Sequence, residues 1–132
     1  MKGEKSSKAE FIYCYSRRQA LADGVHIDVS KTATEAGIRF PVFITRTIYE
    51  RFVAVPEGVQ CQDEAGRLWD ILWMCRHGIA NAPEGQNPVT FELYVRNSND
   101  QPAQLVSLIA ECGAMDFDDP KPAITIYLPE DN

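Results

Sequence analysis

The chain has 132 residues, a formal net charge of −6 and a composition that is 45% hydrophobic and 24% charged. These values fit one globular domain and exclude an intrinsically disordered chain. No apolar run approaches the roughly 20 residues of a membrane-spanning helix, and the N-terminal sequence MKGEKSSKAE lacks the apolar stretch of a signal peptide. We therefore expect a cytoplasmic protein with no membrane partner.

The acidic surplus belongs to the body of the chain, because residues 1–9 carry three lysines against one glutamate. An acidic body repels phosphate, so we expect no direct nucleic-acid binding. The surplus either keeps the domain soluble or forms a surface that mimics nucleic acid towards a basic partner.

The cysteines do not form a metal-binding pattern. They are widely separated and include no C-x-x-C pair, and neither histidine lies at a zinc-site spacing from a cysteine pair. The four cysteines are Cys14, Cys61, Cys75 and Cys112. We expect reduced thiols, no metal and no cofactor.

The first part of the chain predicts a tail followed by short elements. Residues 1–10 are predicted to be a disordered basic and serine-rich tail, and residues 11–132 one globular domain. Residues 11–15 are apolar and aromatic, which favours a short strand or an extended lead-in. Ser16 is typical of a helix N-cap, with Gln19 completing a capping box, and Gly24 ends that short helix.

A strand and a second short helix follow. Residues 25–29 alternate between apolar and polar side chains, which predicts a half-buried strand. Ser30 is predicted to cap a helix that ends at Gly37. Pro41 prevents a helix through the residues just before it, and Thr45 is a plausible cap for a helix over residues 46–53.

The strongest predicted helix begins at Asp63, reaches about His77 and ends at Gly78. On a helical wheel its apolar side chains occupy an arc of roughly 160°. The members of this arc are Leu68, Trp69, Ile71, Leu72, Trp73 and Cys75. We expect this arc to be a major part of the core.

The last third of the chain changes to the period of strands. Residues 89–96 alternate, residues 104–111 form the returning strand, and residues 123–128 form a third strand. Residues 113–122 are predicted to be an acidic loop. The fold class is therefore α+β: a single domain in which N-terminal short helices and one long amphipathic helix pack on a three- to four-stranded, mainly antiparallel sheet.

Arg76 is the first candidate binding residue, because it falls within the apolar arc beside Trp69 and Trp73. A charge there must reach water, stack on an indole or find a carboxylate. Two interpretations stay open. Arg76 either extends to water at the helix C-terminus or binds an anion beside the two tryptophans.

Two other clusters contain ionisable groups. Asp116, Asp118 and Asp119 crowd the predicted loop, but they lack the glycine and terminal glutamate of a calcium loop, which indicates a solvated loop or a partner contact. His26 and Asp28 project from one face of a regular strand and would suit acid–base chemistry. No catalytic motif or phosphate-binding loop accompanies them, so we predict no catalytic residue.

Several segments together resemble a family of small uncharacterised bacterial proteins of unknown function, typical of plasmids, phages and integrative elements. These segments are Tyr15-Ser16-Arg17, Ala22-Asp23-Gly24-Val25, Asp28-Val29-Ser30, Ala36-Gly37, Pro41-Val42, Thr45, Gly66-Arg67-Leu68-Trp69-Asp70-Ile71-Leu72-Trp73-Met74, Cys112-Gly113 and Ile124-Thr125-Ile126-Tyr127-Leu128-Pro129-Glu130. The resemblance covers roughly residues 12–130. It implies an accessory role for a mobile element and supplies no catalytic residues.

We therefore expect a non-enzymatic accessory protein that acts through protein–protein contacts. One alternative is an anti-defence inhibitor with an acidic, nucleic-acid-mimicking surface. Another is a small enzyme for an anionic ligand, with Arg76 or Arg39 as the anion clamp and His26 and Asp28 as the acid–base pair. The apolar arc with its two tryptophans would serve a homodimer interface as well as a monomer core.

Overall fold

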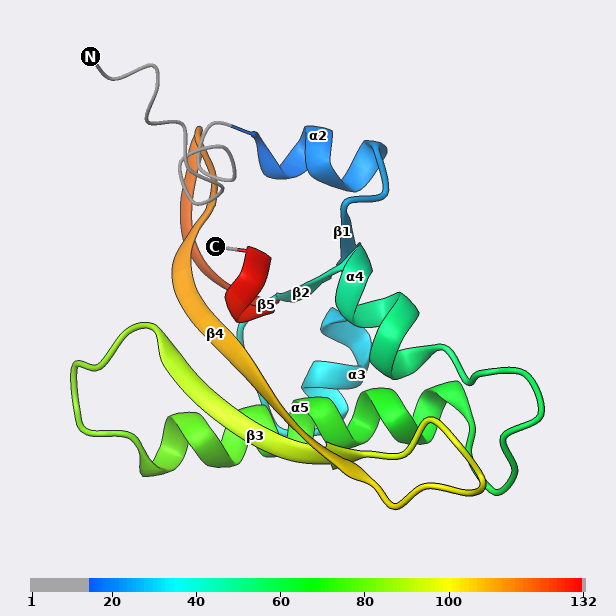
Figure 1. Ribbon diagram of the computed structural model, residues 1–132. Helices are drawn as coiled ribbons and strands as arrows, with labels where there is room; N and C mark the ends of the chain where they lie inside the picture. The colour runs from blue at the N-terminus through cyan, green and yellow to red at the C-terminus, as the bar shows by residue number, and fades with distance from the viewer. Residues whose placement is uncertain (1–14, 132) are drawn as a thin grey trace, which may run out of the picture.

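A five-stranded sheet organises the protein, and a long helix lies across one of its faces (Figure 1). The computed structural model describes residues 15–131, so the predicted tail over residues 1–10 lies outside the described residues. The elements are α2 (Arg17–Ala22), β1 (His26–Asp28), α3 (Ser30–Glu35), β2 (Val42–Thr45), α4 (Arg46–Ile48), η2 (Tyr49–Val53), α5 (Glu64–Asn81), β3 (Val89–Val95), β4 (Gln104–Asp116), β5 (Asp119–Tyr127) and η3 (Pro129–Asp131).

The sheet has the order β1-β2-β5-β4-β3 and is mixed, because β2 runs parallel to β5 while every other pair is antiparallel. The prediction of an α+β fold with a long helix is confirmed, and the prediction of three to four mainly antiparallel strands is wrong in detail. The missed strand is β2. All four of its residues are buried, so it lacks the apolar–polar alternation that identifies a half-buried strand.

The predicted acidic loop over residues 113–122 is also wrong. β4 continues to Asp116 and β5 begins at Asp119, so only Phe117 and Asp118 separate the two strands. The pairing has an irregular register between Ala114 and Asp116. Glycine, proline and acidic residues give this segment the composition of a loop, but backbone pairing with the neighbouring strand overrides that local preference.

Three of the four predicted helix caps are confirmed. The predicted cap at Ser30 is wrong, because α3 already includes Ser30, Val29 precedes it without a side-chain cap, and the Ser30 hydroxyl accepts from the backbone N–H of Val42. The side-chain oxygens of Ser16, Thr45 and Asp63 accept hydrogen bonds from backbone N–H groups of the first turns of α2, α4 and α5. The predicted end of α5 at Gly78 is wrong, because the helix continues to Asn81. A Cβ atom on Gly78 would lie 2.8 Å from Cβ of Phe91, so this glycine lets α5 approach β3 closely.

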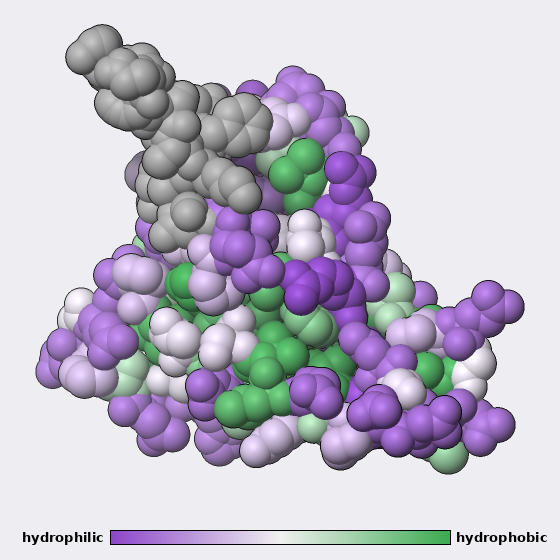
Figure 2. Space-filling view, viewed as in Figure 1, coloured by the Kyte–Doolittle hydropathy of each residue, from purple (hydrophilic) through white to green (hydrophobic). Residues whose placement is uncertain are grey.

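The main core lies between α5, α3 and one face of the sheet. Ile44, Ile126 and Leu108 are fully buried there, together with Ile71 and Leu72 of α5. The opposite face of the sheet carries Phe43, Thr125 and His26, by the alternation of the paired strands. Figure 2 shows this face, the one turned away from α5, with apolar side chains gathered over β4 and β3.

Candidate functional site

The two tryptophans of α5 lie on its outward side and not in the core, which corrects the predicted arc. Trp69 is 37% exposed and Trp73 is 39% exposed. The residues on the opposite side of the helix, Ile71 and Cys75, are fully buried. The indoles stack on each other, with ring centroids 5.9 Å apart and planes inclined by 12°. Four-residue spacing places them one turn apart on the same side of the helix.

Arg76 and His77 complete this surface. The Arg76 guanidinium carbon lies 5.5 Å from the centroid of the Trp73 ring, and the His77 ring meets the same indole edge-on at 5.0 Å. Arg76 is exposed, and no carboxylate among residues 15–131 forms an ion pair with it. The structure therefore places Arg76 at water and against an indole, an arrangement that both interpretations share. We call Trp69, Trp73, Arg76 and His77 the tryptophan surface.

The loop after α3 packs against the tryptophan surface. A Cβ atom on Gly37 would lie only 2.9 Å from Nε of Arg76, and the φ angle of Gly37 is +96°. Glycine is therefore required twice here, for its backbone angle and for the space that the guanidinium occupies. Phe40, three residues further along, is 43% exposed. The cationic group is thus held in place from two elements.

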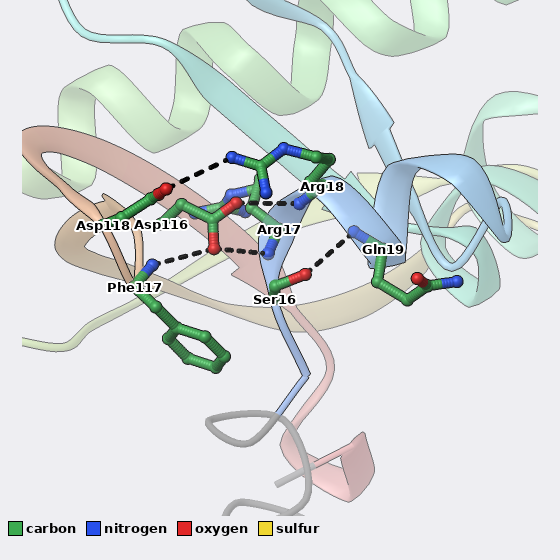
Figure 3. A network of polar contacts seen from close by, with 7 residues as sticks. All are labelled: Ser16, Arg17, Arg18, Gln19, Asp116, Phe117 and Asp118. Atoms are coloured by element: carbon green, nitrogen blue, oxygen red, sulfur yellow. Dashed lines mark hydrogen bonds and ion pairs between the residues drawn. The ribbon is translucent and has the colours of Figure 1, made fainter.

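The acidic candidates lie at the β4–β5 turn, where Asp116 and Asp118 contact α2 (Figure 3). The Asp116 carboxylate accepts hydrogen bonds from the backbone N–H groups of Arg17 and Arg18, at 3.0 Å and 2.9 Å. Asp118 forms an exposed ion pair with Arg18 at 3.5 Å, and Asp119 accepts from the backbone of Lys121. Asp116 therefore fixes the turn to the start of α2.

Hydrogen bonding controls the ionisation of Asp116. Desolvation raises the pKa of this carboxyl group, but bonds from the backbone N–H groups of Phe117, Arg18 and Arg17 outweigh it, so the pKa lies below its usual value. The carboxylate is ionised near neutral pH and is occupied by its own domain. These bonds give Asp116 a structural role in the fold.

His26 contacts an arginine instead of Asp28. Its Nδ1 lies 3.2 Å from Nη1 of Arg17, which also donates to Oγ1 of Thr125 at 2.9 Å. Burial, helped by the Arg17 charge, lowers the pKa of His26 to about 4. The Asp28 carboxylate accepts from the backbone N–H of Ser30 at 2.9 Å. The predicted His26–Asp28 pair shares a face of the sheet but makes no direct bond.

Arg76, one of the two candidate anion clamps of the enzyme hypothesis, does not lie beside His26. His26 pairs with Thr45 on the face of the sheet that carries Phe43. Arg76 belongs to α5, which packs on the other face through Gly78 and Phe91. The sheet therefore separates His26 from Arg76.

Arg67 is the polar residue that the sequence analysis missed. It is only 6% exposed and donates to the carbonyls of Phe52 and Arg96 and to the side-chain oxygen of Asn97, at 2.9, 3.0 and 2.6 Å. Two further acceptors are the Gln62 side chain and the Arg51 carbonyl. Its position four residues before Ile71 was the available signal, because that spacing places it on the buried side of α5.

The family model described as "Family of unknown function (DUF6573)" matches residues 5–132. The chain belongs to this family. Membership confirms that the protein is one of an uncharacterised family, and it assigns no activity and no site residues. No curated protein and no solved structure matches the chain significantly.

For this family member, residues 15–131 hold no group of three or more His, Cys, Asp or Glu side chains placed to bind a metal ion. Within the same residues, no helix is both long enough and apolar enough to cross a bilayer. The feature that the fold leaves unexplained is the tryptophan surface.

Proposed function

We propose that the protein is a non-enzymatic accessory protein that acts through protein–protein contacts, and that a partner binds the tryptophan surface. The observation that carries the proposal is the stacked, partly exposed pair Trp69 and Trp73 with the Arg76 guanidinium over one ring. Tryptophan and arginine dominate the residues that supply binding energy at protein interfaces. Pre-stacked rings also lose little conformational entropy when a partner covers them.

Folding alone does not require this surface. The outward side of a surface helix normally carries polar side chains, whereas α5 exposes Trp69, Trp73, Met74 and Ile79, each between 36% and 39% exposed. The core cluster is complete without the tryptophans. An apolar and cationic surface on an acidic protein is suited to a partner that offers apolar groups flanked by carboxylates.

The family resemblance supports the finer part of the proposal. The segments that resemble proteins of plasmids, phages and integrative elements favour a cytoplasmic accessory role for a mobile element. The alternative of an acidic mimic has less support, because Asp116 and Asp118 are engaged by α2. The enzyme alternative has less support because His26 and Arg76 are on opposite sides of the sheet.

The test is quantitative affinity capture from bacterial lysate with three tagged full-length baits. One is wild type, the second carries Trp69→Ser and Trp73→Ser, and the third carries Phe117→Ser. Phe117 is the matched control, because it is a 67% exposed aromatic residue at the β4–β5 turn. Thermal unfolding of all three baits verifies that they are folded.

We expect one near-stoichiometric partner that wild type and Phe117→Ser retain and that the tryptophan variant loses by at least about tenfold, the effect of removing 1.4 kcal/mol of binding energy. Equal recovery by the tryptophan variant would contradict the proposed surface. Loss with Phe117→Ser alone would move the binding site to the acidic turn and favour the mimic.

A further inference from the structure

The two edges of the sheet differ in how they are protected. β1 is an edge strand of only three residues, and one of them is the charged Asp28. β3 is an edge strand of seven residues that pairs with β4 in unbroken register. Proteins usually protect free edges with short strands, prolines, bulges or lysines. β3 contains none of these, and its one charged residue is Glu92.

The free edge of β3 has no occupant within residues 15–131. In that range, no recorded side chain or loop backbone group bonds the backbone of Val89–Val95, which pairs with β4 alone. The first backbone group past the strand is different, because the Arg96 carbonyl accepts from Arg67 and Gln62. The open edge therefore has a defined end.

Apolar side chains flank this edge on both sides of the sheet. On the face turned away from α5, Tyr94 of β3 is 69% exposed and its β4 neighbour Leu105 is 54% exposed. On the α5 side, Met74 lies seven residues after Arg67 and four before Gly78, so it shares the β3 side of the helix, and it is 36% exposed. A strand added to the edge would lie directly beside Tyr94, which is the member of this group that belongs to β3.

We propose that a second copy of this chain adds its own β3 to this edge, antiparallel, so that one sheet continues across a two-fold axis. The strand is complementary to itself when the two-fold axis passes through Leu93. With the axis at Leu93, Glu92 lies opposite Tyr94 of the other copy, and Phe91 lies opposite Val95. Apolar side chains of the two copies then lie opposite each other on the core side of the sheet. On the other side, Glu92 of each copy lies opposite Tyr94 of its partner, so this favourable pair occurs twice in the dimer.

The two neighbouring registers that keep the same faces together are less favourable. An axis at Tyr94 places Glu92 opposite Arg96, but it leaves only residues 93–95 of the two strands opposed. An axis at Glu92 places the two carboxylates directly opposite each other, and like charges in that position destabilise a strand pair. If one strand slips by a single residue against the other, the core face of one copy continues into the outer face of its partner. Core side chains would then be exposed to water. In a symmetric pair of identical strands the Glu92–Tyr94 contact forms twice. A strand of a different protein would not repeat this contact by symmetry, so we favour a second copy as the occupant.

The oligomeric state of the full chain tests the proposal by sedimentation equilibrium over a range of concentrations. Wild type is expected to be a dimer. Tyr94→Glu places a second carboxylate opposite Glu92 twice per dimer and is expected to weaken association by about tenfold or more. Tyr94→Lys offers Glu92 an opposite charge and is expected to retain the dimer. Phe117→Glu is the control for added charge at a remote site.

Cross-linking tests the register. With Cys14, Cys61 and Cys112 changed to serine, proteins carrying Glu92→Cys and Tyr94→Cys are mixed and oxidised. The proposed register gives the mixed disulfide, whereas a disulfide between two Glu92→Cys copies would overturn that register. A monomeric wild type, or a dimer that Tyr94→Glu leaves intact, would overturn the interface. The variant Trp69→Ser/Trp73→Ser is expected to remain a dimer, so this proposal and the proposed function fail separately.

Discussion

Arg67 and Arg17 are both withdrawn from water, one on each face of the sheet. Arg67 projects from α5 and bonds five oxygen atoms, all of them neutral carbonyl or amide oxygens. Arg17 projects from α2 and reaches His26, Thr125 and the Met115 carbonyl, with its guanidinium carbon 4.1 Å from the Phe43 ring centroid. Burial lowers the pKa of both guanidinium groups.

The difference lies in what can titrate beside each arginine. The partners of Arg67 hold no proton that is gained or lost near neutral pH, so its network depends on geometry alone. Arg17 lies against a histidine that must stay neutral and near the carboxylates of Asp116 and Asp28. The contribution of the Arg17 and His26 contacts to the free energy of unfolding should therefore depend on pH, whereas the contribution of the Arg67 network should not. Neither guanidinium is free for a ligand, which leaves binding to exposed groups.

The largest expected effect is at Arg67. Arg67→Met removes a buried hub and leaves several acceptors unpaired, which should lower the free energy of unfolding by about 3–5 kcal/mol. That is a large part of the total stability of an ordinary domain. Urea unfolding at pH 7 and pH 5 should give the same loss at both values.

The conservative variant separates charge from geometry at this site. Arg67→Lys keeps the positive charge, but one ammonium group cannot reproduce a planar fork that serves five acceptors. We expect it to recover less than half of the loss. Two results would contradict this role of Arg67: full recovery of stability in Arg67→Lys, or a loss of less than about 1 kcal/mol in the free energy of unfolding of Arg67→Met.

A smaller, pH-dependent effect is expected at His26. Its pKa is about 4 in the fold against an ordinary value of 6.5, so the unfolded chain takes up the proton first. The stabilisation is therefore complete above pH 6.5 and is lost as the pH falls towards 4. After allowance for partial solvent screening, the loss between pH 7 and pH 5 should be about 1–2 kcal/mol.

His26→Gln isolates this contribution, because its amide oxygen still accepts from Arg17 and does not titrate. The stabilities of wild type and variant, measured by urea unfolding, should converge as the pH is lowered from 7 to 5. Two parallel curves would show that His26 is protonated at the same pH in the folded and unfolded states.

The sequence predicts the parts of this fold that depend on neighbours along the chain. The caps at Ser16, Thr45 and Asp63 and the long helix are local signals, and the structure confirms them. The parallel pairing of β2 and the extension of β4 to Asp116 depend on distant strands, so composition could not reveal them. The partners of Arg67 come from three separate segments, and no spacing in the sequence brings these together.

The candidate site was predicted in part for the same reason. Periodicity placed Arg76 beside Trp69 and Trp73, and the structure brings the three together. Periodicity did not determine which side of the arc faces water, because large apolar residues extend round more of α5 than the sheet and α3 can cover. The acidic residues 116, 118 and 119 are adjacent as predicted, but Asp116 accepts hydrogen bonds from backbone N–H groups of α2, and no side-chain pattern in the sequence indicates such bonds.

The smallest expected effect is at Arg76. Comparing it with Arg67 tests whether the burial of an arginine determines how much stability is lost when it is replaced. Arg76→Met keeps most of the apolar stem and removes an exposed cation–π contact with Trp73, which is worth about 0.5–1 kcal/mol. Urea unfolding should therefore show a loss several times smaller than that of Arg67→Met, although both residues lie on α5. A loss equal to that of Arg67→Met would mean that the Gly37 loop depends on the guanidinium. Partner capture by Arg76→Met should nevertheless fall well below wild type, because the cation lies on the surface proposed to bind the partner.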